Sequence, residues 1–229
     1  KGLEAHKWYH FAVSYDAASG TTLLYQNGTV VASLSSSIGQ PMNIDQFQMI
    51  SSGEEYFLVD AGGGNGIFKQ LEQAGVPFTG IREMFVTHAH TDHILGAIWV
   101  IRKIATLMSN DKYRRNFIVY GHNEVIDALR TFCRLTLPGK ILKYIDERIF
   151  WGEVKDGTRK EILGLPICFF DILSTKMKQF GFRVLLPDGQ VLVCLGDEPY
   201  NEACKKYVEQ ADWLLAEAFC LYRDREIFS

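Results

Sequence analysis

The chain has 229 residues, of which 47% are hydrophobic, 13% aromatic and 22% charged. This composition is typical of a globular protein with a packed core, and it excludes collagen-like, coiled-coil and intrinsically disordered classes. With 24 basic and 27 acidic side chains the net charge is −3, so no bulk cationic field favours nucleic acid and any RNA contact has to be local. No apolar run reaches the roughly 18 residues of a membrane span, so we expect no membrane-spanning segment.

The first part of the chain predicts an antiparallel β meander. Residues 8–33 alternate apolar and polar side chains around turn signals at 16–20 and at Asn27-Gly28. The pattern W-Y-H-F-A-V-S-Y-D…G-T-T-L-L-Y-Q-N-G-T-V-V-A resembles strands of laminin-G-like, concanavalin-type domains, and the resemblance makes residues 1–37 a fragment of such a domain. About 35 residues cannot bury a two-sheet core, so a remnant of a larger neighbour, a hairpin packed on the rest of the chain and an ordinary hairpin all stay open.

The remaining sequence alternates between strand and helix patterns. The stretch at 34–44 is rich in Ser, Gly and Pro, so residues 38–45 are expected to form a linker, and residues 46–229 are expected to form one domain. In chain order we expect strands at 47–51 and 56–60, a helix at 67–74, a strand at 84–87, a helix at 94–108, a strand at 117–120, a helix at 124–135, strands at 168–173, 180–186 and 191–195, a helix at 199–210 and a strand at 213–216. This interleaving predicts a layered α/β domain.

A histidine cluster lies where a predicted strand ends and a predicted helix begins. Its members are His88, His90, Asp92 and His93. His88 and His90 are two residues apart on an extended segment, so both project to one side. Imidazole and carboxylate donors at this spacing suit Zn²⁺, Mn²⁺ or Fe, and one or two adjacent cations fit. The alternative is a polar turn in which Asp92 caps the helix and the histidines face solvent.

The string T-H-A-H-T-D-H, with an apolar strand before it and Leu-Gly after it, resembles the signature of metallo-β-lactamase-fold hydrolases. The string L-V-C-L-G-D, which ends at Asp197, resembles the family's later strand, whose carboxylate bridges two metals. A-D-W-L-L-A-E-A resembles a stretch of the ribonuclease Z branch. The resemblance covers residues 46–220 and implies an incomplete αββα sandwich. It also implies a metal set of His88, His90, Asp92, His93 and Asp197.

Other residues gain expected roles from the same resemblance. Asp60 ends a strand in V-D-A-G and is expected to orient the histidine loop, without itself binding a metal. Thr175 occupies the place where the family has a further metal histidine, and we expect it beside the ligands. Lys176, Lys178 and His122 are candidates for substrate contact. For His122, the alternative is a capping or surface histidine.

The resemblance is incomplete at both ends of the matching region. The chain stops before the family's later histidines, and the laminin-G-like segment stands in place of the family's first strand. We therefore expect a chimeric or truncated chain, with weakened metal binding and uncertain activity.

The expected function is that of a metal-dependent hydrolase in which a metal-activated water attacks a phosphodiester, with Asp92 holding metal and positioning the water. The favoured function is that of a ribonuclease Z-like phosphodiesterase. An ester or thioester hydrolase of the same fold and a catalytically impaired metal-binding scaffold or interaction module are the alternatives. The expected partners are a phosphodiester or small ester, with RNA and a homodimer left open and no membrane. A cytoplasmic location is expected, although the laminin-G-like segment favours an extracellular one.

Overall fold

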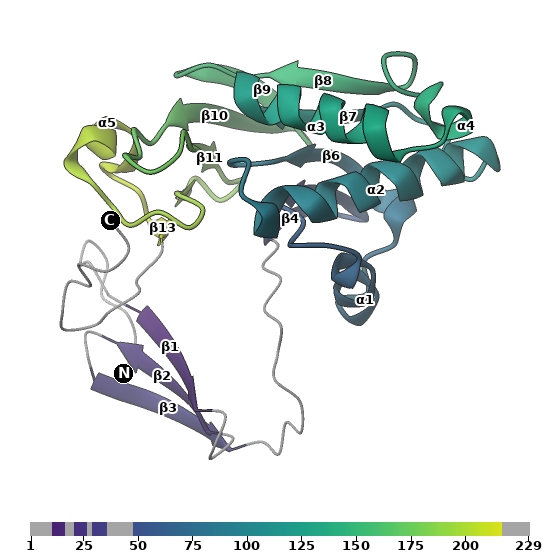
Figure 1. The fold of residues 1–229 in the computed structure, drawn as a ribbon. Coiled ribbons are helices and arrows are strands. Elements are labelled where there is room, and N and C mark those ends of the chain that lie inside the picture. The colour runs from purple at the N-terminus through teal and green to yellow at the C-terminus, as the bar shows by residue number, and fades with distance from the viewer. Residues whose placement is uncertain (1–10, 17–20, 27–28, 36–47, 217–229) are drawn as a thin grey trace. The chain divides into compact units, whose positions relative to one another are not determined.

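The structure is a computed structural model that describes residues 11–16, 21–26, 29–35 and 48–216 (Figure 1). The chain divides into two compact units, one made of residues 1–43 and 218–229 and the other of residues 44–217. The predicted linker at 38–45 lies outside the described residues, so the domain boundaries stay predictions.

The described part of the first unit is a three-stranded antiparallel sheet in the order β1-β2-β3. Its strands are β1 (Phe11–Asp16), β2 (Thr21–Gln26) and β3 (Thr29–Ser35). The register of β2 and β3 shifts between Leu24 and Tyr25. The predicted meander is confirmed in these strands, whereas the laminin-G assignment stays a prediction.

The second unit contains two five-stranded sheets. The first has the order β4-β5-β6-β7-β8, with β4 antiparallel to β5 and the other neighbours parallel. Its strands are β4 (Gln48–Ser52), β5 (Glu55–Val59), β6 (Ile81–Phe85), β7 (Phe117–Gly121) and β8 (Ile149–Glu153). Because parallel strands end at the same edge, the loops after β5, β6 and β7 come together there.

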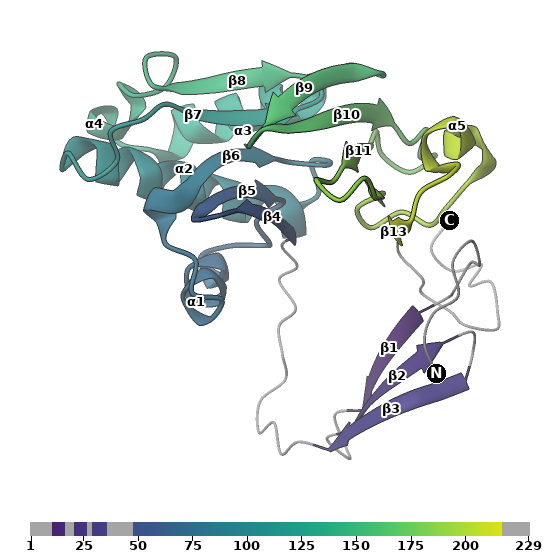
Figure 2. The same ribbon diagram turned by 180° about the vertical axis from the view of Figure 1, so that it is seen from behind.

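The second sheet has the order β13-β12-β11-β10-β9 and is antiparallel except between β12 and β13. Its strands are β9 (Thr158–Ile162), β10 (Leu165–Asp171), β11 (Phe180–Leu185), β12 (Val191–Cys194) and β13 (Trp213–Leu215). The helices of this unit are α1 (Gly66–Gln73), η1 (Phe78–Gly80), α2 (Thr91–Ser109), α3 (Asn123–Thr136), α4 (Gly139–Leu142), η2 (Glu202–Cys204) and α5 (Lys205–Val208). Figures 1 and 2 show α2 and α3 lying along the first sheet.

Side-chain alternation along the strands separates the core into layers. Phe57 and Phe85 face the second sheet, where the ring of Phe85 lies 4.8 Å from that of Phe169 and 6.1 Å from that of Phe182. Met84, the neighbour of Phe85 in sequence, belongs instead to the core shared with α2 and α3. The two faces of the first sheet are therefore both buried, as the predicted α/β sandwich requires.

Several elements of the second unit differ from the sequence expectation. In place of the helix expected at 199–210, the structure has the short helices η2 and α5. Asn201 is the N-cap residue of η2, and its side chain accepts hydrogen bonds from the backbone N–H groups of Ala203 and Cys204. The sequence analysis does not predict strands β8 and β9 or the short helices η1 and α4. Strand β9 reads T-R-K-E-I and lies at the edge of its sheet, where exposed polar side chains hide the apolar alternation.

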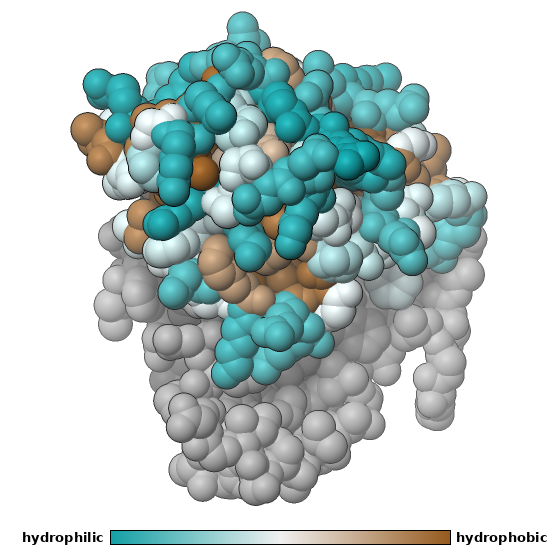
Figure 3. Space-filling view, turned by 90° about the vertical axis from the view of Figure 1, so that its right-hand side faces the viewer, coloured by the Kyte–Doolittle hydropathy of each residue, from teal (hydrophilic) through white to brown (hydrophobic). Residues whose placement is uncertain are grey.

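The surface is polar where Figure 3 shows it, with small hydrophobic groups between hydrophilic side chains. Among the described residues, no helix combines the length and the apolar character needed to cross a bilayer.

Replacement of Phe85 tests the contact between the two sheets. Phe85→Ala removes a fully buried ring and should lower the free energy of unfolding by about 3–5 kcal/mol. Chemical denaturation measures this loss. The control is Leu135→Ala, whose side chain is 69% exposed and should change stability by less than about 0.5 kcal/mol. Equal effects of the two substitutions would contradict this assignment of the core.

Candidate metal centre

The histidine cluster and Asp197 come from the ends of strands in different sheets. His88 and His90 lie in the segment between β6 and α2, and His90 is the N-cap residue of α2. Asp197 follows β12 in the other sheet, after a turn in which Gly196 has a φ of +63°. Phe180 of β11 donates its backbone N–H to the carbonyl of Thr87 over 3.0 Å. This hydrogen bond joins the two sheets directly beside the cluster.

Three side chains converge on one point of the site. Ligand atoms of His88, His90 and Asp197 all lie within 4.8 Å of one another. The distance from His88 Nε2 to Asp197 Oδ2 is 3.5 Å. A tetrahedral zinc with bonds of 2.0–2.1 Å sets its ligand atoms about 3.4 Å apart. The pair is therefore spaced as two ligands of one cation.

A second group of side chains shares the same carboxylate. His93 Nε2 lies 3.4 Å from Asp197 Oδ2 and 3.6 Å from Asp92 Oδ2. Asp92 is 71% exposed in its side chain, whereas His93 is 7% exposed. One oxygen of Asp197 thus faces His88 on one side and His93 on the other.

Buried hydrogen bonds of Asp60 orient both histidines. Asp60 Oδ1 accepts the backbone N–H of Thr87 at 2.8 Å, and Oδ2 lies 2.8 Å from Thr87 Oγ1 and 2.9 Å from His93 Nδ1. Because the Thr87 hydroxyl donates to Asp60, it is left to accept from His88 Nδ1, which lies at 2.9 Å. Both imidazoles therefore carry a proton on Nδ1 and turn Nε2 toward Asp197, which is the arrangement of metal-binding histidines.

The site's charges respond to burial and to these carboxylates. Burial lowers the pKa of His88 to about 4, so this ring is neutral at pH 7. Although burial opposes it, hydrogen bonding to Asp197 and Asp60 raises the pKa of His93 to about 10. For Asp197, burial alone would raise the pKa, but the neighbouring His93 and His88 outweigh it and lower the pKa to about 2. Without a cation, His93 thus holds a positive charge between two carboxylates.

The chemistry of this donor set fits a divalent cation. Asp197 Oδ1 is buried and accepts no hydrogen bond among the described residues. Buried polar atoms are nearly always satisfied, so an orphaned carboxylate oxygen beside two imidazoles points to an ion as its partner. His88, His90, Asp92, His93 and Asp197 are the residues able to hold it.

Known proteins match this chain in sequence. The family described as Anti-Pycsar protein Apyc1 matches residues 36–133, which include the histidine cluster. The ribonuclease Z of Bradyrhizobium sp. (strain ORS 278) is 25% identical over 224 residues, covering 77% of this chain and 71% of that protein. The ribonuclease Z of Bradyrhizobium diazoefficiens is 23% identical over 228 residues, covering 78% and 72%.

Solved structures share the architecture. The metallo-β-lactamase fold protein YhfI from Bacillus subtilis aligns with a TM-score of 0.56 at 18% identity, over 72% of this chain and 61% of that one. Human tRNase Z, short form, aligns with a TM-score of 0.55 at 18% identity, over 72% and 68%. The chain has the metallo-β-lactamase fold. Its ribonuclease Z relatives are hydrolases of this fold, and it spans about three fifths of the length of YhfI.

Other predicted site residues of this metallo-β-lactamase-fold chain lie on the neighbouring loops. His122 is the N-cap residue of α3 but makes no side-chain capping bond, and it is only 1% exposed, so the surface alternative is wrong. Burial and the charge of Lys178 lower the pKa of His122. Lys178 Nζ donates to Asn123 Oδ1 at 2.6 Å. Contact of His122 and Lys178 with substrate stays a prediction.

The loop that precedes β11 carries the remaining predicted residues. Thr175 and Lys176 are exposed. Among the described residues, no hydrogen bond or ion pair connects Thr175 with the metal centre, so its predicted place beside the ligands stays a prediction. The Ser174 hydroxyl is hydrogen-bonded to the carboxylate of Glu198, which ties this loop to the segment after Asp197.

Sequence reasoning missed two buried residues of the site. Thr87 is fully buried, and its hydroxyl is hydrogen-bonded to both Asp60 and His88, so it connects the two side chains. Gln179 is 2% exposed, and its side chain helps to lower the pKa of Asp197. The only sequence signal for Thr87 is its place directly before the first histidine, and Gln179 carries no such signal.

The close contact of α2 with the Asp60 turn gives a test of how His93 is held. A Cβ on Gly96 would lie 1.7 Å from the carbonyl oxygen of Ala61. Gly96→Ala should therefore lower the free energy of unfolding by about 1–3 kcal/mol and weaken metal binding. Thermal denaturation and zinc titration measure the two effects. The control, Gly139→Ala, adds a Cβ in open space and should not destabilise the protein; destabilisation by both would point to a general helix effect.

Zinc binding should weaken as the pH falls, because His93 must lose a proton before Nε2 binds a cation. The pKa of His93 lies at about 10 without a cation, so the proton stays bound through the neutral range. The apparent zinc affinity should then fall about tenfold per pH unit from pH 8 to pH 6. Calorimetric titration at several pH values measures the slope. An affinity that does not depend on pH would remove His93 from the ligand set.

Proposed function

We propose that this chain is a metal-dependent phosphodiesterase of the ribonuclease Z kind. The observation that carries the proposal is the single oxygen of Asp197, which lies 3.5 Å from His88 Nε2 and 3.4 Å from His93 Nε2. The relatives named ribonuclease Z, together with the fold neighbours named tRNase Z and diphosphatase of the PhnP family, support phosphoester chemistry over other hydrolysis.

The metal set would consist of two overlapping groups. His88, His90 and Asp197 would hold one cation, and Asp92, His93 and Asp197 a second. Zinc is the cation we propose, with Mn²⁺ and Fe as alternatives that suit the same donors. Thr175 stands where a further histidine is expected, so each group reaches three ligands only through the shared carboxylate. We therefore propose that the metals are held weakly.

A bound cation would supply Lewis-acid stabilisation of a phosphate oxygen and would lower the pKa of a water toward about 7. The protein's own residues supply the rest. Asp60 and Thr87 keep the lone pairs of His93 and His88 turned to the centre. Asp92 is open to solvent, with a side chain 71% exposed, and would orient an attacking water and accept its proton. Lys178 brings a cationic group that has no carboxylate partner among the described residues and suits a substrate phosphate.

A metal-binding scaffold without turnover is the second candidate. The replacement of a ligand histidine by Thr175 favours it, because a catalytic zinc normally has three protein ligands and an open position. An ester or thioester hydrolase uses the same centre and is the third. A cytoplasmic location, a homodimer and the domain boundaries remain proposals.

Metal removal and one substitution test the function. Zinc- or manganese-dependent hydrolysis of bis-(p-nitrophenyl) phosphate should be lost in chelator and restored by the cation. His90→Ala should lower turnover at least about 100-fold, because ligand losses cost more than the 10–100-fold typical of residues behind the ligands. Thr175→His should raise zinc affinity by adding a donor. Lys140→Ala, at an exposed position on α4, serves as the control.

The remaining outcomes separate the alternatives. Bound metal without turnover on phosphodiester, ester and thioester panels would favour the scaffold. Turnover restricted to esters or thioesters would contradict the proposed phosphodiesterase activity and would support an ester or thioester hydrolase.

A further inference from the structure

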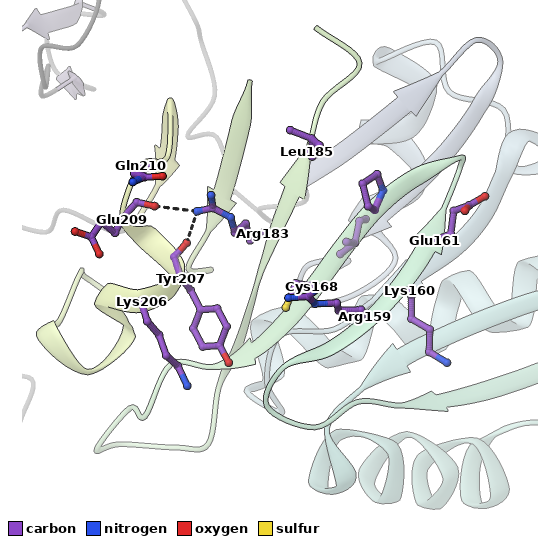
Figure 4. A pocket seen from close by; sticks show the side chains of 12 residues that line it. Arg159, Lys160, Glu161, Cys168, Arg183, Leu185, Lys206, Tyr207, Glu209 and Gln210 are labelled. Carbon is purple, nitrogen blue, oxygen red and sulfur yellow. Dashed lines mark hydrogen bonds between the residues drawn. The ribbon is translucent and has the colours of Figure 1, made fainter. Parts of the chain in front are cut away.

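A groove of about 790 Å³ lies over β9, β10 and β11, and none of the residues that line it belongs to the metal centre (Figure 4). On β10, Phe169 packs between the two sheets, whereas Phe170 packs on the opposite side with Val208 of α5. Alternation places Cys168 on the side of Phe170. The groove therefore lies on the outer face of the second sheet.

Two arginines flank the centre of this groove. Arg159 of β9 and Arg183 of β11 both stand opposite Cys168 in the strand register. Neighbouring strands are about 4.8 Å apart, so the two arginine Cα atoms are separated by about 10 Å. Both guanidinium groups can therefore serve one phosphate or two consecutive phosphates of a chain.

The lining has an excess of positive charge. It contains four basic side chains, Arg159, Lys160, Arg183 and Lys206, and two acidic ones, Glu161 and Glu209. This balance of +2 contrasts with the net charge of −3 of the whole chain.

The cations of the groove differ in how they are satisfied. Among the described residues, the side chains of Arg159 and Lys160 make no hydrogen bond or ion pair. Lys160 stands opposite Ile167 and so lies on the other side of β9 from Arg159. Arg183 donates to the carbonyls of Tyr207 at 2.8 Å and Glu209 at 3.1 Å (Figure 4), and no carboxylate of the described residues forms an ion pair with it. Of these four cations, Lys206 alone has an acidic partner in the part of the chain that the structure describes, which is Asp156 at 3.3 Å. Arginines with uncompensated charge are the residues best suited to phosphate.

We propose that this β9–β11 groove binds the phosphate backbone of a single-stranded RNA segment, outside the metal centre. The inference rests on the proposed function and deepens it, since it assigns the substrate class to RNA longer than a dinucleotide. Phe180, which bonds to Thr87 beside the centre, precedes Arg183 by three residues of β11. This separation is about 10 Å along the strand. Several nucleotides can span it.

Charge reversal in the groove tests the proposal without hydrolysis. The probe is a fluorescently labelled 20-nucleotide RNA without secondary structure, titrated in chelator with the full chain and followed by anisotropy. The variant R159E should bind at least about fivefold more weakly at low salt. Its dependence of log K on log salt should be shallower by about 0.7, because each lost phosphate contact contributes about 0.7 for single strands.

A matched control separates the groove from overall charge. K140E reverses an exposed lysine on α4 whose side chain has no partner among the described residues, so its change in net charge is the same. It should leave RNA affinity within about twofold of the unmodified chain. Circular dichroism of both variants confirms folding. Equal losses in the two variants, or no loss in either, would overturn the proposal.

Two further measurements complete the test. Light scattering that shows a dimer of the unmodified chain, dissociated by R159E, would make the groove an interface between copies and overturn RNA as its occupant. If the unmodified chain binds RNA through the groove but hydrolyses no phosphodiester with any cation, the proposed function fails while the groove assignment stands.

Discussion

The buried carboxylate of Asp60 is the constraint on which the metal centre depends. Its two oxygens accept hydrogen bonds from the backbone and hydroxyl of Thr87 and from His93, although its own backbone has a φ of +56°. A positive φ costs a non-glycine residue free energy of about 1–2 kcal/mol, which three hydrogen bonds to a charged acceptor offset. The same bonds determine which nitrogen of His88 and His93 is left for a cation.

The packing of the two sheets brings the remaining carboxylate to this point. Phe85 ends β6 and packs on Phe169 and Phe182. The chain then continues into the histidine segment. On the opposing sheet, β12 leads to Asp197. Aromatic packing thus sets the distance between ligands that are far apart in sequence, and the hydrogen bond from Phe180 to Thr87 fixes their register.

Electrostatics connects the centre with its expected chemistry. The imidazolium of His93 lies close to two carboxylates, those of Asp60 and Asp197. In the absence of metal, the extra proton on His93 thus supplies the positive charge that a metal ion would bring. The exposed Asp92 adds a further negative charge at the side open to solvent. The β9–β11 groove is built differently, with cations whose charge stays available to an anion. The two sites would thus act on different parts of one phosphate-bearing ligand.

The sequence by itself determined the α/β class, the H-x-H-x-D-H cluster and the Gly-Asp turn, because each is a local pattern of period, spacing or turn chemistry. Tertiary structure decided the rest. Thr87 and Gln179 became site residues, and His122 became buried, through contacts between segments that no local pattern connects. The sequence of β9 lacks apolar alternation, so no local pattern predicts the strand. Only its pairing with β10 shows that Arg159 lies beside Cys168. Burial and pairing depend on neighbours distant in the chain, so their geometry appears only when the two sheets are packed.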